Sequence, residues 1–246
     1  MTASFPGFPP ATFAFLSELR ANNNPNWFKP RKELYDSAVL APFRQLIAMV
    51  GDRLCGEAIP LLGDPRRAIF RIYRDVRFSS DKRLYKTHAG AVLTRSGRKG
   101  DPGLLYLHVE PGASRVAAGF WHPEPPLLLR LRRAILDDPP GFLALAQRMA
   151  ASGHPLGSDK KLSRPPRGFE AAKGTECEDY VGWTSFTAHR PLSDDEMQSP
   201  VILDRILDFA RSVFPLLEWG WAAADDEAPA PLPIPAAIRA PPKPDF

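Results

Sequence analysis

The chain has 246 residues, of which 44% are hydrophobic and 24% are charged, and its formal net charge is +4. These values are ordinary for a globular protein and exclude wholesale disorder, and the length allows one domain with a sizeable core. A mild basic excess does not by itself indicate nucleic-acid binding, which requires basic residues clustered on one face.

Two features predict a cytoplasmic protein without a membrane span. Cys55 and Cys177 are the only cysteines, and they are too far apart in sequence to indicate a disulfide framework or a metal site. The N-terminal segment lacks a basic start, and Pro9 and Pro10 interrupt its apolar run. Neither a signal peptide nor a membrane-spanning segment is therefore expected there.

Helical patterns occupy the first part of the chain. Pro9 and Pro10 suit the first turn of a helix, and an apolar stripe continues as far as Arg20. The asparagine-rich stretch ANNNPNWF ends this helix, because Asn favours helix caps and a following Pro disfavours helical backbone. A second helical region is predicted from about Arg31 to Leu54, with an interruption near Pro42.

The hydrophobic period changes in the middle of the chain. Residues 68–78 are predicted to form a strand, and residues 103–112 a second strand with clean polar–apolar alternation. Residues 114–121 follow a Pro-Gly turn and should pair with the second strand as a hairpin, and residues 179–190 resemble a further strand. Helical patterns return at residues 125–136, 140–149 and 201–214.

This order of helices, strands and helices predicts an α+β fold in which an antiparallel sheet packs against helices. Residues 1–222 are expected to form this single domain. Residues 223–246 contain seven Pro and no helical pattern, so we expect a disordered or polyproline-like tail.

The stretch RIYRDVRFSSDKRLYKT, residues 71–87, concentrates charge beside apolar residues. Successive side chains of a strand point to opposite faces. One predicted face is polar and comprises Arg71, Tyr73, Asp75 and Arg77. The other is apolar apart from one charge and comprises Ile72, Arg74, Val76 and Phe78.

The strand of residues 103–112 has a polar face of its own, formed by Tyr106, His108 and Glu110. Two strands of one sheet must both turn their apolar faces to the core, so we expect the two polar faces to coincide. The candidate ligand-binding residues are therefore Arg71, Arg74, Asp75, Arg77, Lys82, Tyr85, Lys86, Tyr106 and, at the end of the next strand, Trp121. The candidate catalytic residues are His108, Glu110 and Asp75.

Guanidinium groups match the geometry of phosphate and carboxylate. The leading hypothesis is therefore a protein that binds an anionic small molecule around Arg71–Lys86, with Asp75 orienting the arginines. A second is an enzyme acting on a phosphorylated or carboxylated small molecule, with His108 or Glu110 as its acid–base group and Asp75 able to orient His108. A structural ion-pair network around Asp75 stays open as an alternative.

A third hypothesis is a nucleic-acid-binding module. Two further basic segments would supply its phosphate contacts through Arg98, Lys99, Lys160, Lys161, Arg164 and Arg167.

No metal and no cofactor are expected. The chain has no nucleotide-binding, zinc-protease or serine-hydrolase motif, and its five histidines lack the spacing typical of zinc ligands. A carboxylate metal site of Asp75, Asp81 and Glu110 is disfavoured by the neighbouring cations.

The stretch at residues 71–87 resembles the signature of a bacterial family of uncharacterised proteins, domain of unknown function 2461. The resemblance extends over roughly residues 5–220 and includes the stretches FLSELRANNNPNWF, LYLHVEPG, LSRPPRGF and HRPLSDDEMQSP. It implies that the family signature lies at Arg71, Arg74, Asp75, Arg77, Phe78, Asp81, Lys82 and Tyr85. It implies no reaction, although related segments in fungal proteins suspected of chromatin roles point weakly towards nucleic acid. Ala117 and Ala118 stand where the family commonly has Gly.

Overall fold

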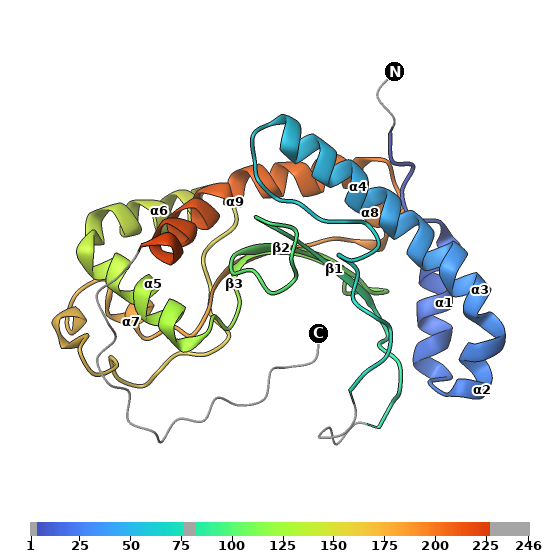
Figure 1. Ribbon diagram of the computed structural model, residues 1–246, viewed down its shortest axis with the longest axis horizontal. Coiled ribbons are helices and arrows are strands. Elements are labelled where there is room, and N and C mark those ends of the chain that lie inside the picture. The colour runs from blue at the N-terminus through green and yellow to red at the C-terminus, as the bar shows by residue number, and fades with distance from the viewer. Residues whose placement is uncertain (1–3, 76–81, 227–246) are drawn as a thin grey trace.

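The computed structural model describes residues 4–75 and 82–226, and its centre is a four-stranded antiparallel sheet in the order β1-β2-β3-β4 (Figure 1). The strands are β1 (Ala89–Thr94), β2 (Leu104–Val109), β3 (Arg115–Phe120) and β4 (Phe186–Pro191). The α+β fold with an antiparallel sheet is thereby confirmed.

Helices precede, interrupt and follow the sheet in sequence. They are α1 (Pro10–Ala21), α2 (Pro25–Phe28), α3 (Lys32–Tyr35), α4 (Ala41–Gly56), α5 (Pro125–Asp137), α6 (Pro139–Ala151), α7 (Glu178–Val181), α8 (Asp194–Met197) and α9 (Val201–Asp225). The described residues also form the 3-10 helices η1 (Lys29–Arg31) and η3 (Glu170–Ala172) and the π-helix η2 (Asp36–Leu40). Within the described residues, none of the helices combines the length and apolarity needed to cross a bilayer.

The predicted interruption near Pro42 takes the form of a wider helical turn. Residues 32–56 are helical throughout, but the π-helix η2 lies directly before Pro42 in the first turn of α4. Proline lacks the N–H that an α-helical turn would use, so the chain changes its hydrogen-bond spacing there without ending the helix.

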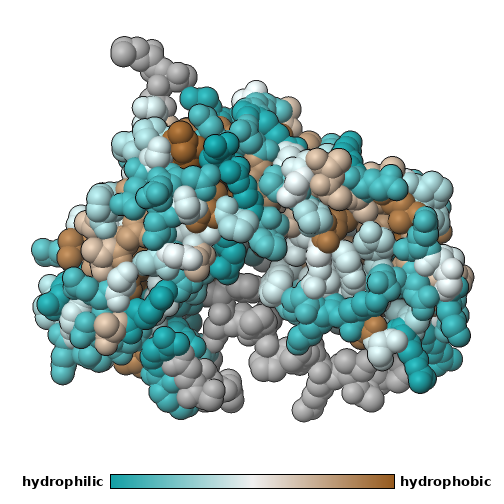
Figure 2. Space-filling model, turned by 180° about the vertical axis from the view of Figure 1, so that it is seen from behind, coloured by the Kyte–Doolittle hydropathy of each residue, from teal (hydrophilic) through white to brown (hydrophobic). Residues whose placement is uncertain are grey.

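The core lies between one face of the sheet and the helices α4 and α9, which cross that face (Figure 1). Leu105, Leu107 and Val109 of β2 point into this core, and all three are buried. Side chains that alternate with them point to the opposite face of the sheet. That polar face is turned away from α4 and α9, and Figure 2 shows the molecule hollowed along its lower edge on that side.

Helix α9 is longer than predicted, because it continues through Pro215 to Asp225. Leu216, Leu217 and Trp221 are buried beyond the proline, and their packing offsets the hydrogen bond that Pro215 cannot make. Residues 223–225 are therefore helical, three residues past the predicted domain boundary at 222; residues 227–246 of the predicted tail lie outside the described residues.

The predicted strand at residues 68–78 is wrong for its described part. Residues 68–75 form isolated bridges at Ile69 and Tyr73 and no regular strand, while residues 76–78 lie outside the described residues. Residues 71–75 and 82–87 instead form what we call the arm, two extended segments joined by the Arg74 N–H to Leu84 O bond (2.9 Å) and the Lys86 N–H to Ile72 O bond (2.7 Å).

The first strand of the sheet is β1, which the sequence patterns did not predict. All six of its residues are buried, so AGAVLT shows no alternation of polar and apolar residues. The prediction for residues 179–190 was also wrong in its first half, because Glu178 and Asp179 begin the short helix α7, whose first turn favours acidic residues.

Candidate functional site

A row of polar side chains on β2 forms one continuous hydrogen-bonded chain. The hydroxyl of Tyr106 lies 2.8 Å from Nδ1 of His108, and Nε2 of His108 lies 2.9 Å from Oε2 of Glu110. A carboxylate can only accept hydrogen bonds, so Nε2 of His108 donates to Glu110 and Nδ1 accepts from the Tyr106 hydroxyl. The alternation predicted for residues 103–112 therefore places these three side chains together, as expected.

The far oxygen of Glu110 ties this row to two other elements. Oε1 accepts a hydrogen bond from Nη2 of Arg20 on α1 at 2.8 Å and a longer one from the Thr87 hydroxyl at 3.4 Å. Arg20 is 90 residues away from Glu110 in sequence, and no local pattern predicts this pair.

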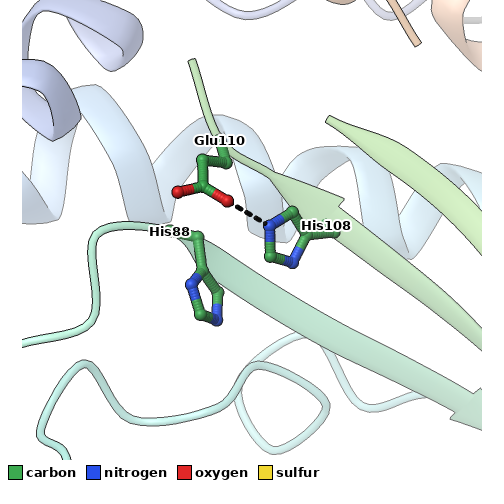
Figure 3. A group of neighbouring side chains, drawn as sticks. All are labelled: His88, His108 and Glu110. Carbon is green, nitrogen blue, oxygen red and sulfur yellow. Dashed lines mark hydrogen bonds and ion pairs between the residues drawn. The ribbon is translucent and has the colours of Figure 1, made fainter. Parts of the chain in front are cut away.

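His88 adds a second imidazole to the row. It lies just before β1, and its ring stacks on that of His108 with centroids 4.3 Å apart and planes at 29° (Figure 3). One ligand-type atom from each of His88, His108 and Glu110 lies within 4.8 Å of the other two. Sequence reasoning missed His88 because β1 itself was missed.

The register of β1 and β2 explains this placement. Gly90 pairs with His108, and His88 lies two residues before Gly90, so both lie on the face of His108. A Cβ at Gly90 would lie 2.9 Å from the Tyr106 hydroxyl oxygen, so the absence of a side chain there leaves room for the tyrosine.

Burial keeps both imidazoles neutral at pH 7. It lowers the pKa of His88 to about 4, with the neighbouring His108 adding to the effect. Burial also lowers the pKa of His108, although the hydrogen bond to Glu110 acts the other way. Burial alone would raise the pKa of Glu110, but the His108 hydrogen bond and nearby positive charge outweigh it, so that pKa is lowered. The site therefore combines two imidazole lone pairs with one carboxylate.

Cationic side chains surround the row. The Lys86 and Lys99 ammonium groups lie 5.4 and 4.7 Å from the centroid of the Phe70 ring. Lys99 donates a hydrogen bond to the Ile69 carbonyl oxygen at 2.6 Å, and burial lowers its pKa. Arg115 of β3 pairs in register with His108.

Residues 11–219 match a family described as a conserved hypothetical protein, DUF2461. The chain belongs to the DUF2461 family. The matched range contains all four strands, the arm and the polar row of β2. No curated protein and no solved structure matches the chain.

Not every candidate of this DUF2461 chain lies in the row. Lys86, Tyr106, His108 and Glu110 come together, and the remaining candidates lie elsewhere. Tyr85 is buried and stacks on Phe28 with centroids 4.4 Å apart. Those remaining candidates are Arg71, Arg74, Asp75, Lys82 and Tyr85 on the arm, Trp121 directly after β3, and Arg77, which lies outside the described residues.

Two expectations about the arm are corrected. Its polar face does not join that of β2 in one sheet, because β1 is the strand that pairs with β2. Both ring nitrogens of His108 have partners in Tyr106 and Glu110, so Glu110, and not Asp75, orients this imidazole.

Asn23 fixes the arm to the N-terminal helices. Its side-chain oxygen accepts from the Tyr85 N–H and its side-chain nitrogen donates to the Tyr85 carbonyl, both at 2.9 Å. The asparagine-rich stretch thus does more than end α1, because it positions the segment that leads to Lys86 and His88.

The basic segments of the DUF2461 chain are partly paired within the protein. Arg98 lies 3.9 Å from Asp101, and Lys161 forms an ion pair with Asp179. Lys160, Arg164 and Arg167 are exposed. A separate apolar hollow is lined by Leu136, Pro139, Leu143, Ala171, Thr175, Glu176 and Cys177, and it contains no member of the polar row.

Proposed function

We propose that this DUF2461 protein binds a small molecule with a phosphate or carboxylate group at the polar face of its sheet. The observation that carries the proposal is an excess of cations. Arg20 neutralises Glu110, whereas Lys99 and Arg115 have no carboxylate partner among the described residues. An anion would offset this charge.

The two groups of cations flank the imidazoles. Arg115 lies on β3, whereas Lys86 and Lys99 lie beside Phe70, whose N–H donates to Gly90 O at the outer side of β1. At about 4.8 Å per strand, these backbones are about 14 Å apart. Long cationic side chains can reach inward over that span, so a phosphorylated or carboxylated small molecule fits between them.

The same arrangement suits an enzyme acting on such a molecule, which is the second candidate. The Tyr106–His108–Glu110 chain holds one imidazole in a fixed orientation, and His88 has no hydrogen-bond partner among the described residues. A ligand found by the binding test below would define the substrates to screen for turnover.

Calorimetric titration with inorganic phosphate and with citrate at low ionic strength tests the proposal. We expect one anion per chain, and Lys99→Met and Arg115→Met should each weaken binding about tenfold or more, because a hydrogen bond to a charged group contributes about 1.5–3 kcal/mol. Lys160→Met, which removes an exposed cation that is not one of those beside the row, is the matched control and should leave the affinity unchanged.

Absence of anion binding in the wild-type chain, or an equal loss in all three variants, would refute the proposal. Binding only to DNA or RNA, with a steep salt dependence and sensitivity to Lys160→Met, would instead support the nucleic-acid alternative.

A further inference from the structure

We propose that His88, His108 and Glu110 form a binding site for a divalent transition-metal ion. Their ligand-type atoms all lie within 4.8 Å of one another, and the three residues come from the adjacent strands β1 and β2 or directly border them (Figure 3). This site goes beyond anion binding, because it adds a cation with its own ligands.

The hydrogen bonds around the cluster separate inner from outer atoms. Nδ1 of His108 has Tyr106 as its partner, and Oε1 of Glu110 has Arg20 and Thr87. The inner atoms, Nε2 of His108 and Oε2 of Glu110, face each other. Metal ligands in proteins are held in the same way, with the far atom of each ligand fixed by an outer partner.

His108 can change its tautomer without losing its hydrogen bond to Tyr106. A metal ion would take the lone pair of Nε2, and the ring proton would move to Nδ1. The Tyr106 hydroxyl can then accept the hydrogen bond that it donates in the absence of metal, because a hydroxyl serves as donor or acceptor. Tyr106 is therefore suited to both states of the site.

Binding a metal ion would require only small movements of the three ligand atoms. Metal–ligand bonds of about 2.1 Å place neighbouring ligand atoms roughly 3.0–3.4 Å apart. Nε2 of His108 and Oε2 of Glu110 are already 2.9 Å apart and need to separate by a few tenths of an ångström. His88 would approach by at most about 1–2 Å, and it lies in the irregular segment before β1.

The donor set defines the class of metal. Two imidazoles and one carboxylate suit Zn²⁺, Fe²⁺, Mn²⁺ or Co²⁺, whereas Mg²⁺ and Ca²⁺ prefer oxygen ligands. Three protein ligands also leave coordination positions open. The surrounding Lys86 and Arg115 oppose a bare dication, so an anion bound at an open position should strengthen metal binding.

Equilibrium dialysis of the tag-free full chain against ZnCl₂, together with CoCl₂ titration followed by visible absorption, tests the site. We expect one ion per chain and cobalt absorption bands that report nitrogen and oxygen ligands. His88→Ala and Glu110→Gln should each weaken binding more than tenfold, and Tyr106→Phe about 10–100-fold, as expected for the loss of an outer partner. His189→Ala, which removes an exposed histidine of β4, is the control and should bind as wild type.

Circular dichroism of each variant separates lost ligands from lost folding, and His88 is the most informative position because it is only half-buried. Fewer than 0.1 ions per chain at about 100 μM free metal, or wild-type affinity in folded His88→Ala and Glu110→Gln, would overturn the proposal. If the chain bound phosphate but no metal ion, the metal site alone would be refuted. The anion-binding proposal would then still be supported.

Discussion

Gly220 of α9 lies against the Phe120 ring of β3, and replacing it by alanine should destabilise the protein. A Cβ at this position would lie 2.1 Å from Cε2 and 2.3 Å from Cζ of Phe120. Carbon atoms in contact are about 3.5–4.0 Å apart, so the ring or the helix would have to move by more than about 1 Å. The Phe120 ring is buried and also lies close to Gly103, which leaves it little space. Overpacking costs about 1–3 kcal/mol, and the gain in helix propensity of about 1 kcal/mol offsets part of it.

Urea unfolding followed by circular dichroism measures this effect. We expect Gly220→Ala to lower the free energy of unfolding by up to about 2 kcal/mol, which is the overpacking cost less the gain in helix propensity. Gly56→Ala is the matched control, because a Cβ at Gly56 of α4 meets no atom within 4 Å. The control should be neutral or stabilising by up to about 1 kcal/mol. If both variants unfolded at the same urea concentration, the close approach of α9 to β3 would be refuted.

Three further substitutions test the site and the packing of α9. Tyr106→Phe removes the donor to His108 and should cost about 1–2 kcal/mol of stability in urea unfolding. Gly90→Ala should displace the same hydroxyl, so the double variant should lose less than the sum of the two single losses; full additivity would show that the two changes act independently. Glu57→Gln breaks a double hydrogen bond of 2.6 and 2.7 Å to Arg211, which lowers the pKa of Glu57. A lowered native pKa gives stability above the unfolded pKa that is lost as the pH falls, so the deficit of this variant should be under about 1 kcal/mol at pH 7 and should shrink as acid protonates Glu57. A deficit that did not change as the pH was lowered would contradict this origin.

Local periodicity predicted the parts of the fold that alternate or repeat. The β2–β3 hairpin, the boundaries of α1 and α5, and the α+β class follow from patterns that a few neighbouring residues define. The same alternation places Tyr106, His108 and Glu110 on one face of their strand, whatever the rest of the chain does. These predictions hold because the period of a strand or helix is set by local backbone geometry.

Local periodicity failed where burial was complete or backbone pairing was irregular. The fully buried β1 has no polar face to mark it, and the arm has strand-like alternation without a regular strand. The hypothesis that Asp75 could orient His108 depended on the arm pairing with β2, whereas the strand that pairs with β2 there is β1.

Alternation in the amino-acid sequence is enough to predict an antiparallel sheet with a polar row of Tyr106, His108 and Glu110. The stacking of His88 on this row and the ion pair of Arg20 with Glu110 depend on the tertiary structure. Strand register and helix placement are fixed by packing between segments distant in sequence. A single chain read locally contains no signal for a contact across 90 residues.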